Sequence, residues 1–176
     1  MIDKVDGNKE FPKLAMGVFI LTMITIAVYE MLTLDADLSA REETVVLVAG
    51  GVVGSIGGII GGLIGISIQY VFIKYPTQWL TKEEFVYKNE IWEAIFYSST
   101  AGFLINFLLI QFGLPANLLV STIVSILTTG LFLLIYFSGR EKEPHIKRAI
   151  TIVQIAWIVI GFGLGFVLNL FADMAV

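Results

Sequence analysis

Long apolar runs separated by short polar stretches form the main pattern of this chain. Five of these runs reach about 20 mostly apolar residues, the length that crosses a bilayer as a helix. The first run ends near Asp35 without a small-residue cleavage site, which indicates a retained span and not a signal peptide. The pattern predicts an all-α, polytopic transmembrane helix bundle with five spans, at residues 14–34, 44–73, 91–114, 116–137 and 150–171.

Composition strengthens this interpretation. The 176 residues are 57% hydrophobic and only 15% charged, which is too apolar for a soluble domain. No soluble stretch of domain size remains, so we expect residues 1–176 to form a single integral-membrane domain in the cell membrane. The net charge of −4 comes mostly from acids near the membrane surfaces. It gives no reason to expect a nucleic-acid partner, whereas the lipid bilayer is an obligatory one.

The basic residues predict an orientation. If the N-terminus is cytoplasmic, all but Arg41 of the eleven Lys and Arg residues fall on the cytoplasmic side. Lys and Arg in short loops determine the orientation of spans, so we predict an N-inside, C-outside topology.

Local motifs predict where several helices begin and end. Two stretches fit the capping box, Ser39-Ala40-Arg41-Glu42 and Thr81-Lys82-Glu83-Glu84. The second predicts that the third helix begins at Thr81, with a short interfacial segment before its span. Gly139 suits the end of the fourth helix, and Pro144 suits the first turn of the fifth.

Glycines are concentrated in the second run. On a helical wheel eight of them share an arc of roughly 140°, so one face is nearly bare backbone. GxxxG spacing of this kind lets helices approach closely in a membrane, which predicts a glycine-zipper packing interface. The interface comprises Gly50, Gly51, Gly54, Gly57, Gly58, Gly61, Gly62 and Gly65.

The occupant of this face is left open by the sequence. It is a helix of the same chain, an identical subunit in a homo-oligomer, or another membrane-protein subunit. No cofactor is predicted, although a bound lipid, quinone or carotenoid, or a conduction path, would also use such a face.

Polar residues inside the spans form a second pattern. Several share one side of the fourth helix, where they suit either a core network or a polar permeation path. Asn106 falls near mid-membrane, and we expect Gln154 or a hydroxyl of the fourth helix as its partner. Glu30 lies near the outer end of the first span, where it can pair with Arg41 or handle ions. The full set is Glu30, Asn106, Asn117, Ser121, Ser125, Thr128 and Gln154.

The chain lacks several residue types that enzymes commonly use, which argues against an enzyme. The chain has no cysteine, and its only histidine, His145, follows Pro144 in a loop. No histidine pair within the spans can hold haem, copper or a di-iron centre, and no metal site is predicted. No basic residue within the spans can activate a serine, so no catalytic residue is predicted.

Two functional hypotheses follow. The first is a small integral-membrane scaffold or accessory subunit of a membrane protein complex, which packs through the glycine face. The alternative is a small channel or transporter with a hydroxyl-lined path along the fourth helix. The short chain, the extended small-residue face and the lack of central charge favour the first.

Overall fold

Five helices account for the regular structure of this chain. The computed structural model describes residues 10–35, 43–83, 86–114, 117–139 and 141–174, and these ranges contain no strand. Each helix includes a window long and apolar enough to cross a membrane, which confirms the predicted five-helix architecture. The helices are α1 (Lys13–Asp35), α2 (Glu43–Thr81), α3 (Lys88–Gln111), α4 (Leu118–Ser138) and α5 (Pro144–Met174).

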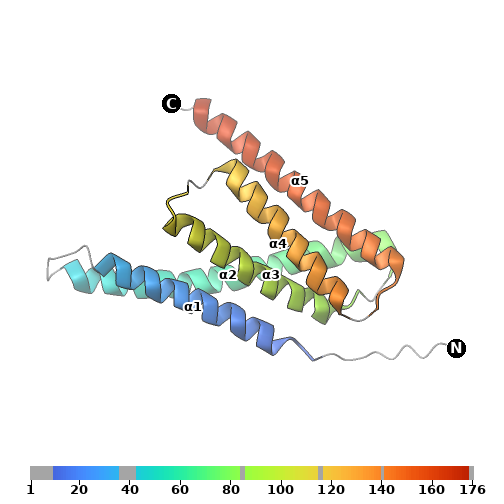
Figure 1. The fold of residues 1–176 in the computed structure, drawn as a ribbon, viewed down its shortest axis with the longest axis horizontal. Coiled ribbons are helices and arrows are strands. Elements are labelled where there is room, and N and C mark those ends of the chain that lie inside the picture. Colours follow the sequence, from blue (N-terminus) through green and yellow to red (C-terminus); the bar gives the residue numbers. More distant parts are fainter. Residues whose placement is uncertain (1–9, 36–42, 84–85, 115–116, 140, 175–176) are drawn as a thin grey trace.

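The helices alternate in direction around a central α3. Helix α3 contacts α1, α2 and α4, while α5 contacts α2 and α4. The start of α3, the end of α4 and the start of α5 share one end of the bundle, at the right of Figure 1. This end, which we call the basic end, carries Lys88, Lys142 and Lys147. The N-inside orientation stays a prediction, because helix packing does not distinguish the two sides of a membrane.

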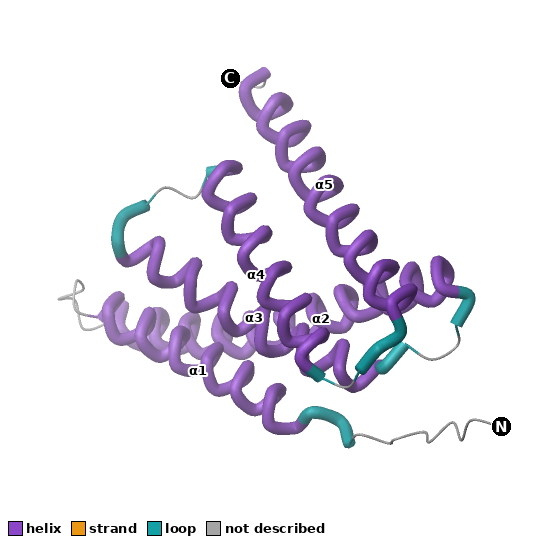
Figure 2. The backbone as a smooth tube through the Cα atoms, turned by 45° about the vertical axis from the view of Figure 1, so that its right-hand side comes forward, coloured by secondary structure: helices purple, strands orange, loops and turns teal. Residues whose placement is uncertain are grey.

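Burial is concentrated toward the basic end. Ile91, Ile95 and Phe96 of α3 are almost completely enclosed, together with Tyr136 of α4 and Ile150 of α5. At the opposite end, the last turns of α5 stand apart from the other helices, as Figures 1 and 2 show from two directions. The bundle is therefore closed at the basic end and splayed at the other.

The predicted start of the third helix at Thr81 is wrong. Thr81 is the last residue of α2, and α3 begins only at Lys88. The Thr81 hydroxyl donates to the carbonyl of Thr77, 2.8 Å away, so it closes the end of α2 and does not open α3. Lys82 follows in the left-handed conformation (φ 56°), a common helix terminator. The described residues between Lys82 and Tyr87 are not helical, and the predicted interfacial helix before α3 is not confirmed.

Other helix ends agree better with the sequence. Gly139 is the C-terminal cap of α4, and Pro144 is the first residue of α5, as predicted. Gly113 ends α3 with a positive φ of 67°, a conformation in which glycine is unstrained. Its amide and that of Leu114 bond back to α3 carbonyls in a Schellman motif. The capping box predicted at Ser39 lies outside the described residues.

Candidate functional site

The glycine-rich face of α2 is largely uncovered by the described residues of the chain. At five of its glycines, an added methyl carbon would meet no described atom of another element within 4 Å. We call these five the α2 glycine surface; they are Gly54, Gly57, Gly58, Gly61 and Gly65. The surroundings of Gly50 and Gly51 lie outside the described side chains.

Among the glycines of the predicted interface whose surroundings are described, Gly62 closely approaches another helix of the chain. A methyl carbon at Gly62 would lie 3.2 Å from Met23 Cε and 3.5 Å from Phe19 Cζ, both on α1. Helix α1 therefore borders one side of the α2 glycine surface. The other side is bordered by Ile56, Ile60 and Ile64, which are exposed. The surface is thus a shallow strip of backbone between α1 and a ridge of isoleucines.

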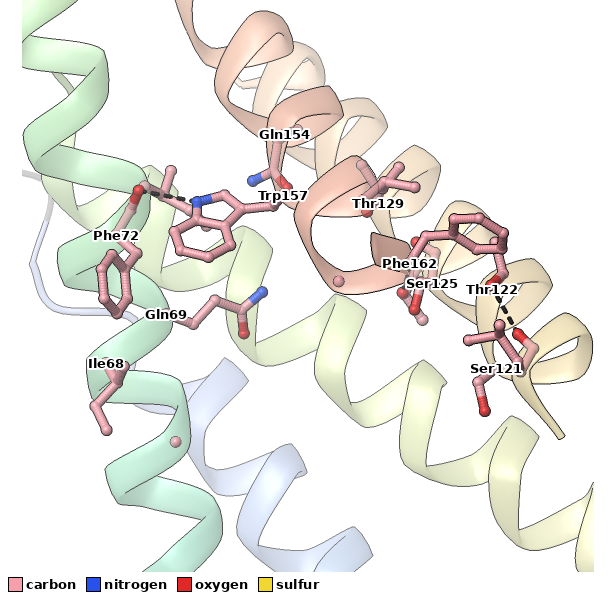
Figure 3. Close-up of a pocket in the computed structure, with 16 residues that line it drawn as sticks. Ile68, Gln69, Phe72, Ser121, Thr122, Ser125, Thr129, Gln154, Trp157 and Phe162 are labelled. Carbon is pink, nitrogen blue, oxygen red and sulfur yellow. Dashed lines mark hydrogen bonds between the residues drawn. The ribbon is translucent and has the colours of Figure 1, made fainter. Parts of the chain in front are cut away.

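A cavity of about 530 Å³ lies between α2, α4 and α5. We call it the α2–α4–α5 cavity. Apolar rings, including Phe72, Trp157 and Phe162, form part of its wall. Its polar lining comes from all three helices and consists of Gln69, Ser121, Thr122, Ser125, Thr128, Thr129 and Gln154 (Figure 3).

A smaller cavity of about 260 Å³ adjoins the first along α3 and α4. It adds Asn106 and two serines of α3, Ser98 and Ser99. The two cavities share five polar residues, Gln69, Ser125, Thr128, Thr129 and Gln154. Together they form one polar region between α2, α3, α4 and α5.

Two threonines of α4 direct only lone pairs into this region. The Thr122 hydroxyl donates to the carbonyl of Leu118 at 2.7 Å, and the Thr128 hydroxyl donates to that of Val124 at 2.9 Å. A hydroxyl whose proton is bound to its own helix keeps its oxygen lone pairs as acceptors. The donors that the cavity offers to a ligand must therefore come from other groups.

Gln154 supplies such a donor. It lies on α5, is only 4% exposed, and its Nε2 has no hydrogen-bond partner among the described residues. Figure 3 shows Gln154 reaching from α5 and Gln69 reaching from α2 into the same space. A buried amide without a partner is unusual, because desolvation is then not offset by a bond.

Pro76 accounts for the contact that holds α5 against α2. A proline has no amide hydrogen, so the carbonyl four residues earlier, that of Phe72, loses its helical partner. The indole Nε1 of Trp157 donates to this carbonyl at 3.2 Å, and the two rings meet edge to face at 4.8 Å. The Trp157 ring is thereby fixed as one wall of the cavity, as Figure 3 shows.

Five of the seven predicted polar residues line the two cavities, and the other two lie elsewhere. Ser121, Ser125, Thr128 and Gln154 line the α2–α4–α5 cavity, and Asn106 joins three of them in the smaller cavity. Asn106 lines the same cavity as Gln154 and the hydroxyls of Ser125 and Thr128, and its hydrogen bond to one of them stays a prediction. The other two predicted residues lie elsewhere: Glu30 is exposed on α1, and Asn117 caps α4 by accepting from the amide of Val120 at 2.8 Å.

Sequence reasoning missed a buried ion pair at the basic end. Lys142, between α4 and α5, pairs with Glu90 in the first turn of α3, and their side chains are 0% and 6% exposed. The Lys142 ammonium also lies 4.5 Å from the ring centre of Tyr136 and donates to that residue's carbonyl. Gly139 makes room, since a methyl carbon there would lie 2.5 Å from Glu90 Oε2. No local spacing could have indicated a pair between the first turn of α3 and the loop that joins α4 to α5.

His145 belongs to a second charged cluster near this end. Its Nε2 lies 3.4 Å from a carboxylate oxygen of Glu83, and its Nδ1 lies 3.3 Å from one of Glu143. The three ligand atoms are close enough to hold a metal ion. However, each imidazole nitrogen faces a different carboxylate, and all three side chains are exposed to between 40% and 65%. This geometry suits weak surface pairing better than shared coordination of one ion.

The five apolar helices define a multi-pass α-helical membrane protein. Comparisons with models of known families, with curated proteins and with solved structures find no match to this chain. The α2 glycine surface and the two cavities are the features of the described chain that bear on its function.

Proposed function

We propose that this protein is a small scaffold or accessory subunit that packs against another membrane subunit through the α2 glycine surface. The openness of that surface supports the proposal. A methyl group at any of its five glycines would meet nothing nearby in the described part of the chain. Lipid provides little hydrophobic drive between helices, so close backbone contact is the main source of association energy. An uncovered strip of backbone offers that contact to a second helix.

The border of this surface also suits a helix as occupant. Ile56, Ile60 and Ile64 form a ridge beside the strip, and ridges of this kind insert beside the small residues of a partner helix. A partner helix with its own small residues would bring its backbone against α2. Either a second copy of this chain, through its own α2, or a different subunit can supply such a helix.

The test is the mass of the intact particle after gentle extraction from the native membrane. We expect a particle heavier than one chain, and we expect Gly58→Leu or Gly61→Leu to reduce it to the single chain. Gly163→Leu is the matched control, because Gly163 on α5 also has open space around it and does not line the cavity. Unchanged assembly in both α2 variants would remove the basis of this proposal.

A second candidate function is transport of a small uncharged polar solute along α4. The hydroxyl-lined α2–α4–α5 cavity favours it, since four of the predicted path residues line that cavity. Its test is glycerol flux into proteoliposomes. Transport predicts measurable flux that Ser125→Leu abolishes while the particle mass stays the same; flux no greater than in protein-free liposomes would exclude it for this solute class.

A further inference from the structure

The α2–α4–α5 cavity combines properties that point to a specific class of ligand. Its volume of about 530 Å³ falls within the range of roughly 300–1,000 Å³ typical of small-molecule sites. The described residues that line it include no acid, base or histidine. A charged group placed there would lack a counter-ion inside the membrane, so the ligand must be uncharged.

The position of the cavity indicates a lipophilic ligand. Gln154 lies near the middle of the spanning window Pro144–Val167, and Gln69 lies near the middle of Ile56–Thr81. Ile68, Phe72 and Phe162 line the cavity and are also exposed at the surface of the bundle. At this depth the surrounding medium is acyl chain, so a molecule enters most readily from the bilayer.

Gln154 specifies the polar group of the ligand. Its amide nitrogen is buried in the wall without a partner among the described residues, and an amide hydrogen in such a place requires an oxygen acceptor. The Thr122 and Thr128 hydroxyl protons are already bound to their own helix, so these two residues offer only acceptors, whereas Gln69, Ser121, Ser125 and Thr129 can donate as well as accept. The Trp157 indole hydrogen is likewise bound to Phe72, which leaves its ring as an apolar wall.

We propose that the α2–α4–α5 cavity binds an uncharged lipophilic molecule through a carbonyl or hydroxyl oxygen that accepts a hydrogen bond from Gln154 Nε2. The aromatic wall of Phe72, Trp157 and Phe162 contacts the apolar body of the molecule. This inference does not depend on assembly through the α2 glycine surface. A lipophile in this cavity would also occlude the polar route that transport along α4 requires.

Photolabelling in proteoliposomes tests the proposal. The probes are a long-chain ketone and an alkane of equal length, each carrying a diazirine at the same carbon. We expect the ketone to label cavity residues such as Trp157 and Phe162 at least fivefold more than the alkane does. Gln154→Met, which keeps the length of the side chain but removes the amide, should abolish that difference. Gln111→Met, at the far end of α3, is the matched control and should preserve it.

Competition then identifies the source of the oxygen. Excess decyl-benzoquinone displaces the ketone if the site accepts quinone carbonyls, and excess dioleoylglycerol displaces it if the site accepts lipid esters or hydroxyls. Displacement by either supports the proposal. Failure of both competitors, equal labelling by ketone and alkane, or full labelling of Gln154→Met would overturn it.

Thermal unfolding gives a second readout that does not require the probe. If Gln154 serves ligand binding, Gln154→Met should raise the unfolding midpoint of the delipidated protein. In the wild type, added decyl-benzoquinone or dioleoylglycerol should raise the midpoint, and Gln154→Met should remove that increase. A lowered midpoint without ligand would mean that the amide has a structural role, which contradicts the proposal.

Discussion

The bond between Trp157 and the Phe72 carbonyl makes a prediction about how α5 is held to α2. Pro76 removes the helical partner of that carbonyl, and Trp157 Nε1 replaces it at 3.2 Å. Trp157→Phe keeps an aromatic ring against Phe72 but leaves the carbonyl without a donor in an apolar medium. We expect this variant to lower the free energy of unfolding.

The magnitude follows from two contributions. Side-chain hydrogen bonds within membranes contribute about 0.6 kcal/mol on average and up to roughly 1.7 kcal/mol. A buried acceptor left without a partner adds a desolvation penalty of about 1–3 kcal/mol, reduced here because the site is partly exposed. We therefore expect Trp157→Phe to cost about 1–2 kcal/mol.

Pro76→Ala provides the decisive comparison. The substituted alanine has an amide hydrogen that can donate to the Phe72 carbonyl in the usual helical pattern, which makes the indole donor redundant. In the Pro76→Ala background we expect Trp157→Phe to cost less than about 0.5 kcal/mol, which corresponds to a coupling energy of about 1 kcal/mol.

The assay is reversible unfolding in mixed micelles, followed by far-ultraviolet circular dichroism so that the loss of a tryptophan does not alter the signal. Trp79→Phe is the control, because Trp79 is 85% exposed, and we expect it to change stability by less than about 0.5 kcal/mol. An equal cost of Trp157→Phe in the wild-type and Pro76→Ala backgrounds would show that the proline does not create the need for the indole donor.

Two further predictions concern the basic end. Lys142→Met leaves the Glu90 carboxylate buried without this partner, and it should lower the free energy of unfolding by about 3–5 kcal/mol in the same assay. The double variant with Glu90→Gln should recover most of this loss. A double variant no more stable than Lys142→Met would argue against the ion pair. Gly139→Ala should lower stability by about 1–3 kcal/mol, because its methyl carbon would lie 2.5 Å from Glu90 Oε2, whereas Gly130→Ala, with open space around it, should be neutral or stabilising. Equal stability of the two glycine variants would contradict the close approach at Gly139.

The sequence predicted helices well because in a membrane each helix must satisfy its own backbone. Apolar runs of spanning length therefore become helices almost independently of their neighbours. The same reasoning identified the α4 residues that line the cavity, since Ser121, Ser125 and Thr128 share a side of one regular helix. The existence of each helix and the side that its polar residues share could therefore be predicted from the pattern of apolar and polar residues alone.

The start of α3 was predicted wrongly because its signal was ambiguous. A threonine hydroxyl can accept from free amides at the start of a helix or donate to a carbonyl at the end of one. Thr81 does the latter, and the left-handed Lys82 stops α2 directly after it. When the preceding helix extends as far as a Thr-x-x-Glu motif, the motif alone does not show whether the threonine ends that helix or begins the next one.

Contacts between helices could not be predicted from the sequence for a different reason. The pair of Lys142 with Glu90 and the bond of Trp157 to Phe72 join segments 52 and 85 residues apart, and neither follows from a period. Each of these two contacts nevertheless has a physical cause in the folded bundle. Gly139 gives the ion pair room, and Pro76 gives the indole an unbonded carbonyl.

The bundle is closed toward the basic end, where the buried apolar residues and the pair of Lys142 with Glu90 lie, and it is open at the other end. Trp157 of α5 is bonded to the Phe72 carbonyl that Pro76 leaves free on α2, and the C-terminal part of α5 stands apart from the other helices (Figure 2). The divergence leaves the α2 glycine surface uncovered and opens the α2–α4–α5 cavity beside it, with Gly65 bordering both. A tighter crossing of α5 over α2 would bury the glycines and fill the cavity together. The two proposed sites therefore result from one helix-packing arrangement, although we propose different classes of partner for them and test each proposal separately.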